Sequence, residues 1–120
     1  MPLTKAEIRN RALRKLGVLG KGETPDTATA EDMDAAYDEV YARVEFENLA
    51  AWAENASVPD RFVPAMVNLC ALARVTEESI SDTRLNKLLI ETGPDGEKCI
   101  NQIRARSVDE YESSEPAVYF

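Results

Sequence analysis

The 120-residue chain contains no histidine and only two cysteines, Cys70 and Cys99. Without an imidazole, Ser/His and Cys/His nucleophilic machinery cannot be built, and the commonest side-chain base at neutral pH is missing. Two separated thiols without a CxxC spacing do not make a zinc site. Carboxylates are abundant, but they fall on helix faces where solvation explains them. We therefore expect no enzymatic activity, no cofactor and no metal, and two reduced cysteines packed as small apolar groups.

Long apolar runs are also lacking. None approaches the ~20 residues that a membrane helix requires, and the opening residues do not have the pattern of a signal peptide. The segment from Gly17 to Gly22 has the glycine spacing of a phosphate-binding loop, but Glu23 stands where that motif needs lysine. No predicted strand leads into it, so a nucleotide site is not expected.

Basic residues are outnumbered, with 14 Lys and Arg against 22 Asp and Glu, for a net charge of −8. This charge argues against a protein that wraps nucleic acid by electrostatic attraction, although it allows a role beside DNA. The length suits one domain with its own core. Helical spacing of the apolar residues predicts the all-α class, a small helical bundle of four to five helices within residues 1–106.

The first helix is predicted from a capping box over Thr4–Glu7, and Gly17 is expected to end it in the left-handed conformation. Its apolar stripe is Ile8, Ala12, Leu13 and Leu16. Its other faces are basic, with Lys5, Arg9, Arg11, Arg14 and Lys15. Two interpretations of this basic run stay open. It pairs with the acidic helix that follows, or it contacts a nucleic acid backbone or an acidic partner protein.

A long acidic helix is predicted from Glu31 to Asn55, capped by Thr29, as the central helix of the domain. Its apolar stripe includes Val40, Val44 and Trp52, and a second apolar patch suggests neighbours on two sides. The acids Glu31, Asp34, Asp38 and Glu45 fall along one line of this helix. Arg43 is expected to pair with the acids four residues before and after it.

Pro64 is predicted in the first turn of a third, very apolar helix. We expect a cooperative core that contains Val40, Val44, Leu69 and Leu72. Residues 83–106 form either one kinked helix or two helices, because Gly93–Gly96 interrupts the pattern.

Residues 107–120 differ in composition from the preceding helices and are predicted to form an extended acidic C-terminal tail. The tail carries four acids, Pro116 stops any helix, and the last residues are apolar and aromatic. Such a tail either folds back on its own bundle or docks on a partner, with Tyr111 as a further aromatic anchor.

Three segments, in this order, resemble one known family. Residues 8–18, IRNRALRKLGV, are similar to its opening helix, residues 36–43, AYDEVYAR, to its second helix, and residues 58–65, VPDRFVPA, to the start of its third. Together they span the region from about residue 5 to 106. On these residues the chain resembles the head-to-tail adaptor (head completion, or packaged-DNA stabilisation) proteins of tailed bacteriophages.

The resemblance implies a homo-oligomeric ring, commonly dodecameric, that sits beneath the portal at the capsid vertex of the virion after synthesis in the host cytoplasm. The ring would extend the DNA channel, retain packaged DNA without sequence-specific binding, and contact the portal protein and the next tail component. No membrane is involved. The residues expected to dock on the portal are Tyr111, Pro116, Ala117, Val118, Tyr119 and Phe120. Those expected between subunits or facing the channel are Arg9, Arg11, Arg14, Lys15, Asp34, Asp38 and Glu45.

Two other classes of protein remain open. One is a small helical regulator that places its basic first helix on nucleic acid, and the other is an acidic inhibitor that masks a basic partner. Native mass in the presence of portal distinguishes both from a ring.

Overall fold

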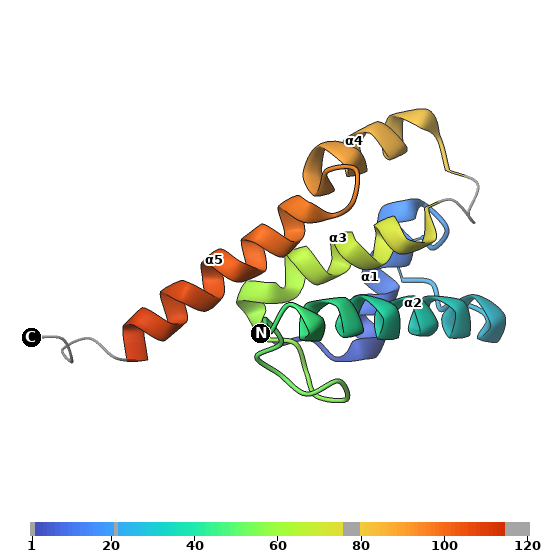
Figure 1. Cartoon of the computed structure of the whole chain (residues 1–120). Coiled ribbons are helices and arrows are strands. Elements are labelled where there is room, and N and C mark those ends of the chain that lie inside the picture. The colour runs from blue at the N-terminus through green and yellow to red at the C-terminus, as the bar shows by residue number, and fades with distance from the viewer. Residues whose placement is uncertain (1, 21, 76–79, 115–120) are drawn as a thin grey trace, which may run out of the picture.

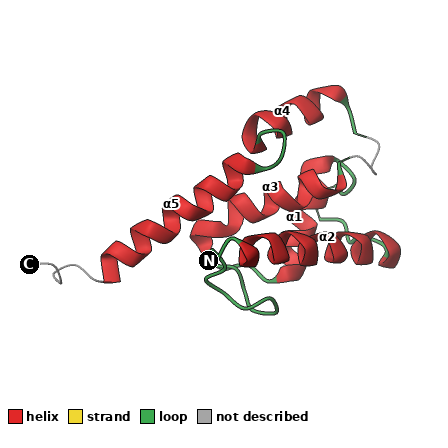
Figure 2. Cartoon of the chain, in the orientation of Figure 1, coloured by secondary structure: helices red, strands yellow, loops and turns green. Residues whose placement is uncertain are grey.

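The computed structural model describes residues 2–20, 22–75 and 80–114, with side chains as far as Arg106. In these ranges the chain forms five α-helices and a short 3-10 helix, and no strand. The helices are α1 (Lys5–Leu16), α2 (Thr27–Phe46), α3 (Val63–Arg74), α4 (Asp82–Thr92) and α5 (Glu97–Ser114), and η1 (Asp60–Phe62) directly precedes α3 (Figures 1 and 2). The predicted all-α class is confirmed.

Helix α1 begins and ends as predicted. Thr4 Oγ1 accepts the backbone N–H of Glu7 at 3.2 Å, and Glu7 Oε1 accepts that of Thr4 at 3.0 Å. Gly17 has φ 79°, and the N–H of Val18 donates to the carbonyl of Leu13 at 3.0 Å. These bonds satisfy backbone groups that a helix leaves free at its two ends. The predicted apolar stripe Ile8, Ala12, Leu13 and Leu16 is buried.

Helix α2 lies earlier in the chain than predicted. Asp26, not Thr29, is its N-cap, because Asp26 Oδ1 accepts the N–H of Thr29 at 2.8 Å. The helix ends at Phe46, and Asn48 adopts a φ of 60°, which the helix cannot accommodate. The predicted helix from Glu31 to Asn55 was therefore wrong at both ends. Its apolar stripe is right as far as Val44, which is fully buried.

The segment after α2 turns back over that helix, and Trp52 lies in this segment rather than on the helix as predicted. The Trp52 ring stacks on Phe62 of η1 with centroids 5.1 Å apart and meets Tyr41 edge-on at 6.0 Å. The Tyr41 hydroxyl donates to the Trp52 carbonyl at 2.5 Å, and the indole N–H donates to the Tyr37 hydroxyl at 3.3 Å. These four residues, the aromatic cluster, fix the loop between α2 and η1 with its polar groups satisfied.

Helix α3, not α2, is the central helix. It lies between the other elements in Figure 1 and contacts α1, α2, α4 and α5. Its buried residues are Val63, Ala65, Met66, Val67, Asn68, Leu69, Cys70 and Ala71. Pro64 lies in its first turn, as predicted. Of the four core residues predicted, Val40, Val44 and Leu69 are buried, whereas Leu72 is only partly buried.

The interruption at Gly93–Gly96 separates two helices, α4 and α5, which settles the alternative left open by the sequence. Gly96 has φ 76°, and a Cβ atom built on it would lie 2.6 Å from Cδ2 of Leu69. The turn is also held by Arg43, whose Nη1 donates to the carbonyl of Asp95 at 2.5 Å. Arg43 therefore binds the α4–α5 turn rather than the two glutamates predicted for it.

Helix α5 continues through Ser114, so the predicted boundary at residue 107 falls inside a helix. The backbone of residues 107–114, including Tyr111, is helical and not extended. Cys99, Ile100 and Ile103 pack the first part of α5 into the core, and its second part projects away from the other helices (Figure 1). The projection contributes to a longest dimension of 55 Å. Pro116, Ala117, Val118, Tyr119 and Phe120 lie outside the described residues.

We expect Leu69→Ala to lower the free energy of unfolding by about 2–5 kcal/mol, because it removes a buried side chain and leaves a cavity beneath Gly96. Urea denaturation measures the change. Leu72→Ala is the matched control and should have a smaller effect, since Leu72 is only partly buried. If the two variants lost the same free energy of unfolding, Leu69 would be no more buried than Leu72.

We expect Gly96→Ala to destabilise the chain by more than about 1 kcal/mol, because alanine is strained at positive φ and its Cβ collides with Leu69. Gly22→Ala separates the two causes. Gly22 has φ 83° with no atom within 4 Å of a Cβ, so it reports the backbone strain alone. Thermal melts measure both variants. Equal melting temperatures would exclude a steric role for Gly96.

Candidate interaction surfaces

The basic face of α1 is partly neutralised by α2 of the same chain. Lys5 Nζ lies 2.6 Å from Oδ1 of Asp38, and Arg9 Nη1 lies 3.3 Å from Oδ2 of Asp34. Of the two interpretations of the basic run, pairing with the acidic helix that follows is therefore confirmed for Lys5 and Arg9. Arg9, Asp34 and Asp38 thus each have an ion-pair partner within one chain, and the position between subunits or facing the channel expected of them stays a prediction.

The remaining predicted charges lie apart from one another. Arg11 and Arg14 are exposed on α1, Glu45 is exposed on α2, and none of their side chains has a hydrogen bond or ion pair with the described residues. Arg11 borders a shallow hollow of about 310 Å³ with Leu3 and Pro64. The structure thus does not bring Arg11, Arg14 and Glu45 into one site.

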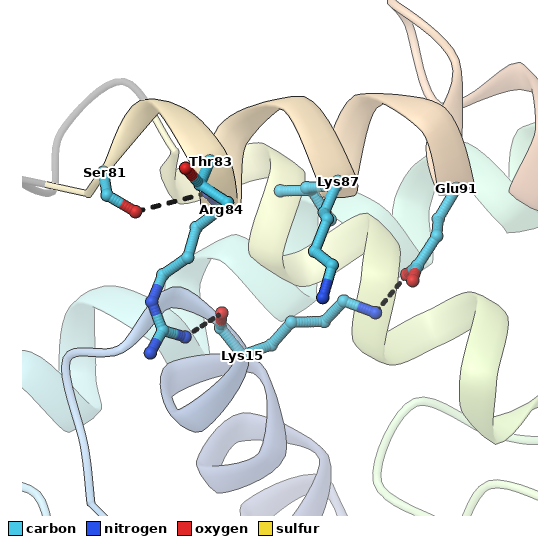
Figure 3. A pocket seen from close by; sticks show the side chains of 7 residues that line it. Lys15, Ser81, Thr83, Arg84, Lys87 and Glu91 are labelled. Atoms are coloured by element: carbon cyan, nitrogen blue, oxygen red, sulfur yellow. Dashed lines mark hydrogen bonds and ion pairs between the residues drawn. The ribbon is translucent and has the colours of Figure 1, made fainter.

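Lys15 belongs to a groove between the end of α1 and α4, with a volume of about 520 Å³. Figure 3 shows the side chains that line it. Arg84 reaches from α4 and donates from Nη1 to the Lys15 carbonyl at 3.2 Å, and Lys15 reaches back to form an ion pair with Glu91. Lys87 also lines the groove and has no hydrogen bond or ion pair with the described residues.

Arg84 and Lys87 were not identified from the sequence. Both lie on a short helix with mixed charges, and only the packing of α4 against the end of α1 brings them beside Lys15. The same contact leaves little room for a side chain at residue 17, because a Cβ on Gly17 would lie 2.9 Å from Nε of Arg84. The groove is therefore a consequence of tertiary structure.

The outward face of α2 is acidic. Glu31, Ala35, Asp38, Ala42 and Glu45, at alternating steps of four and three residues, are exposed. Phe46 at the end of this face is 84% exposed. Glu47, predicted to pair with Arg43, lies instead 3.2 Å from Nη2 of Arg104 on α5. Apart from Asp38, which pairs with Lys5 of α1, the side chains of this face have no hydrogen bond or ion pair with the described residues.

Both cysteine thiols are buried. Cys70 is fully enclosed, and burial raises the pKa of its thiol to about 12. Burial also raises the pKa of Cys99, and the two thiols are not joined to each other. No cluster of acids and cysteines suited to a metal occurs among the described residues. No helix in these ranges is long and apolar enough to cross a membrane.

The chain was compared with protein families, curated proteins and solved structures. No family model matches the chain, and no curated protein or solved structure matches it either.

We expect a double-mutant cycle on Arg9 and Asp34 to give a coupling energy of about 0.2–1 kcal/mol that falls as salt is added, since both side chains are partly exposed. Urea denaturation of the single and double alanine variants measures it. The cycle of Arg9 with Glu54 should give no coupling. A coupling that grows with protein concentration would place the Arg9–Asp34 pair between subunits.

Proposed function

We propose that this protein is a structural head-to-tail connector of a tailed bacteriophage. It assembles as a ring, dodecameric in the simplest case, beneath the portal, where it extends the DNA channel, retains packaged DNA and presents a surface to the next tail component. It acts in the neck of the virion after synthesis in the host cytoplasm.

The observation that carries the proposal is the ordered succession of the three segments at residues 8–18, 36–43 and 58–65. In the fold these segments belong to α1, to α2, and to η1 with the start of α3, which pack together around one core. The resemblance therefore covers the helices that define the body of the molecule rather than an isolated peripheral motif.

The charge of the chain supports the same proposal. A net charge of −8 disfavours retention of a phosphate backbone, so a duplex can move past such a protein without being held. The pairing of α1 with α2 leaves fewer free cations on α1 for a nucleic acid, which weighs against the regulator alternative.

The shape supports a role as a connector between the portal and the tail. Helix α5 leaves the core after Ile103 and projects from the bundle (Figure 1). The described helix ends at Ser114, away from the core of its own chain, where a portal subunit can bind it. Tyr119 and Phe120 are the proposed anchors, because aromatic side chains remove a large apolar area from water at the cost of few torsions.

We expect deletion of residues 116–120 to leave the melting temperature nearly unchanged and to abolish attachment to heads that carry the portal protein of the same genome. The last residue seen in the core is Ile103, so the deletion removes none of the described packing. Co-sedimentation with heads measures attachment, and calorimetry measures melting.

The variant Tyr119→Ser/Phe120→Ser keeps the chain length and separates loss of the aromatic anchors from loss of backbone. It should also fail to attach. A truncated chain that melts markedly lower and still attaches would assign these residues to the fold of their own chain. A full-length chain that stays monomeric on portal-bearing heads would refute the connector function itself.

A further inference from the structure

The outward side of α4 is a surface without a neighbour in the described chain. Thr83, Lys87 and Ile90 recur at steps of four and three residues and are all exposed, with Ile90 69% exposed. This stripe borders the groove that contains Lys15 and Arg84 (Figure 3). We call Lys15, Arg84, Lys87 and Ile90 the basic face.

The outward side of α2 has the opposite character. Its acids Glu31, Glu39 and Glu45 are exposed, and their carboxylates have no hydrogen bond or ion pair with the described residues. Between them Ala35 and Ala42 leave room for a close helix neighbour. We call Glu31, Glu39, Ala42, Glu45 and Phe46 the acidic face. Each face thus combines unpaired charge of one sign with one large exposed apolar side chain, Ile90 or Phe46.

The two faces cannot meet within one chain. Helices α2 and α4 lie on opposite sides of α3, which contacts both (Figure 1). A contact between two different surfaces on opposite sides of one molecule is heterologous, and repetition of such a contact gives a closed ring or an open filament.

We propose that the basic face of one copy docks on the acidic face of the next copy, with α4 packed along α2. Lys87 pairs with Glu39 and Glu45, and Ile90 packs against Ala42 and Phe46. This inference rests on the proposed connector function, since a ring makes a second copy of this chain the partner. Charge complementarity sets the order of the faces, and the two apolar side chains are excluded from water in the contact.

A protein partner fits the basic face better than a nucleic acid does. Lys15 is already paired with Glu91, and Arg84 already binds the Lys15 carbonyl, which leaves Lys87 as the unpaired cation among the described residues of the groove. Affinity for a phosphate backbone grows with the number of phosphates that are neutralised, and one free cation neutralises few. The exposed Ile90 beside it suits an apolar contact instead.

The test is self-association of the full chain by sedimentation velocity and native mass spectrometry at low salt. We expect Lys87→Glu, and separately Glu39→Lys/Glu45→Lys, to weaken association by roughly tenfold or more. An equimolar mixture of the two variants should associate again, because each reversed face then meets an opposite charge on the other variant. The mixed assemblies should contain the two variants in alternation.

Arg106→Glu and Glu54→Lys are the matched controls, since they reverse exposed charges outside both faces. They should associate as the unaltered chain does, and all variants should keep its melting temperature.

Association that is unaffected by the face variants, or a mixture that does not recover, overturns the proposed contact while leaving the connector function in place. An unaltered chain that stays monomeric at its highest soluble concentration also overturns the contact, and attachment to portal-bearing heads then tests the function separately. Loss of duplex DNA binding in Lys87→Glu, with no change in mass, would assign the basic face to nucleic acid.

Discussion

Burial of α3 is the constraint on which the rest of the structure depends. The helix is 12 residues long and is covered on several sides, so each other helix is placed by the side of α3 that it buries. An apolar helix of this kind gains stability from its neighbours and not from its own propensity. Leu69 illustrates the consequence, because it requires both a partner helix and the absence of a side chain at Gly96.

Two connections return the chain to α3, and each is held by its own set of side-chain contacts. The aromatic cluster holds the loop after α2 against η1, where both tyrosine hydroxyls and the indole N–H take part in hydrogen bonds. The α4–α5 turn instead uses a glycine at positive φ and an arginine from α2. Both sets of contacts satisfy polar groups in the places where the chain reverses, which a small all-α domain needs in order to exclude water from its core.

The distribution of charge follows from this packing. Helix α1 lies beside α2, so part of its basic face is neutralised within the chain, and unpaired charge is left on the outward sides of α1, α2 and α4. A chain that carries the unpaired Lys87 on the α4 side and unpaired acids on the opposite, α2 side has two different surfaces for neighbouring subunits. This arrangement is compatible with a subunit that binds its neighbours in one rotational sense, as the proposed ring requires.

The sequence by itself determined the all-α class, the capping box and glycine end of α1, the apolar stripe of α2 as far as Val44, and Pro64 at the start of α3. These features depend on residues within one or two helical turns of each other, where local periodicity and capping decide. Only the tertiary structure decided the ends of α2, the position of Trp52, the central place of α3 and the helical state of residues 107–114. It also decided which charges pair and which stay exposed, because Arg84 and Lys15, or Arg9 and Asp34, are far apart in the chain and meet only when helices pack. Contacts between distant residues leave no periodic signal in a single sequence, and for that reason the candidate faces became visible only in the fold.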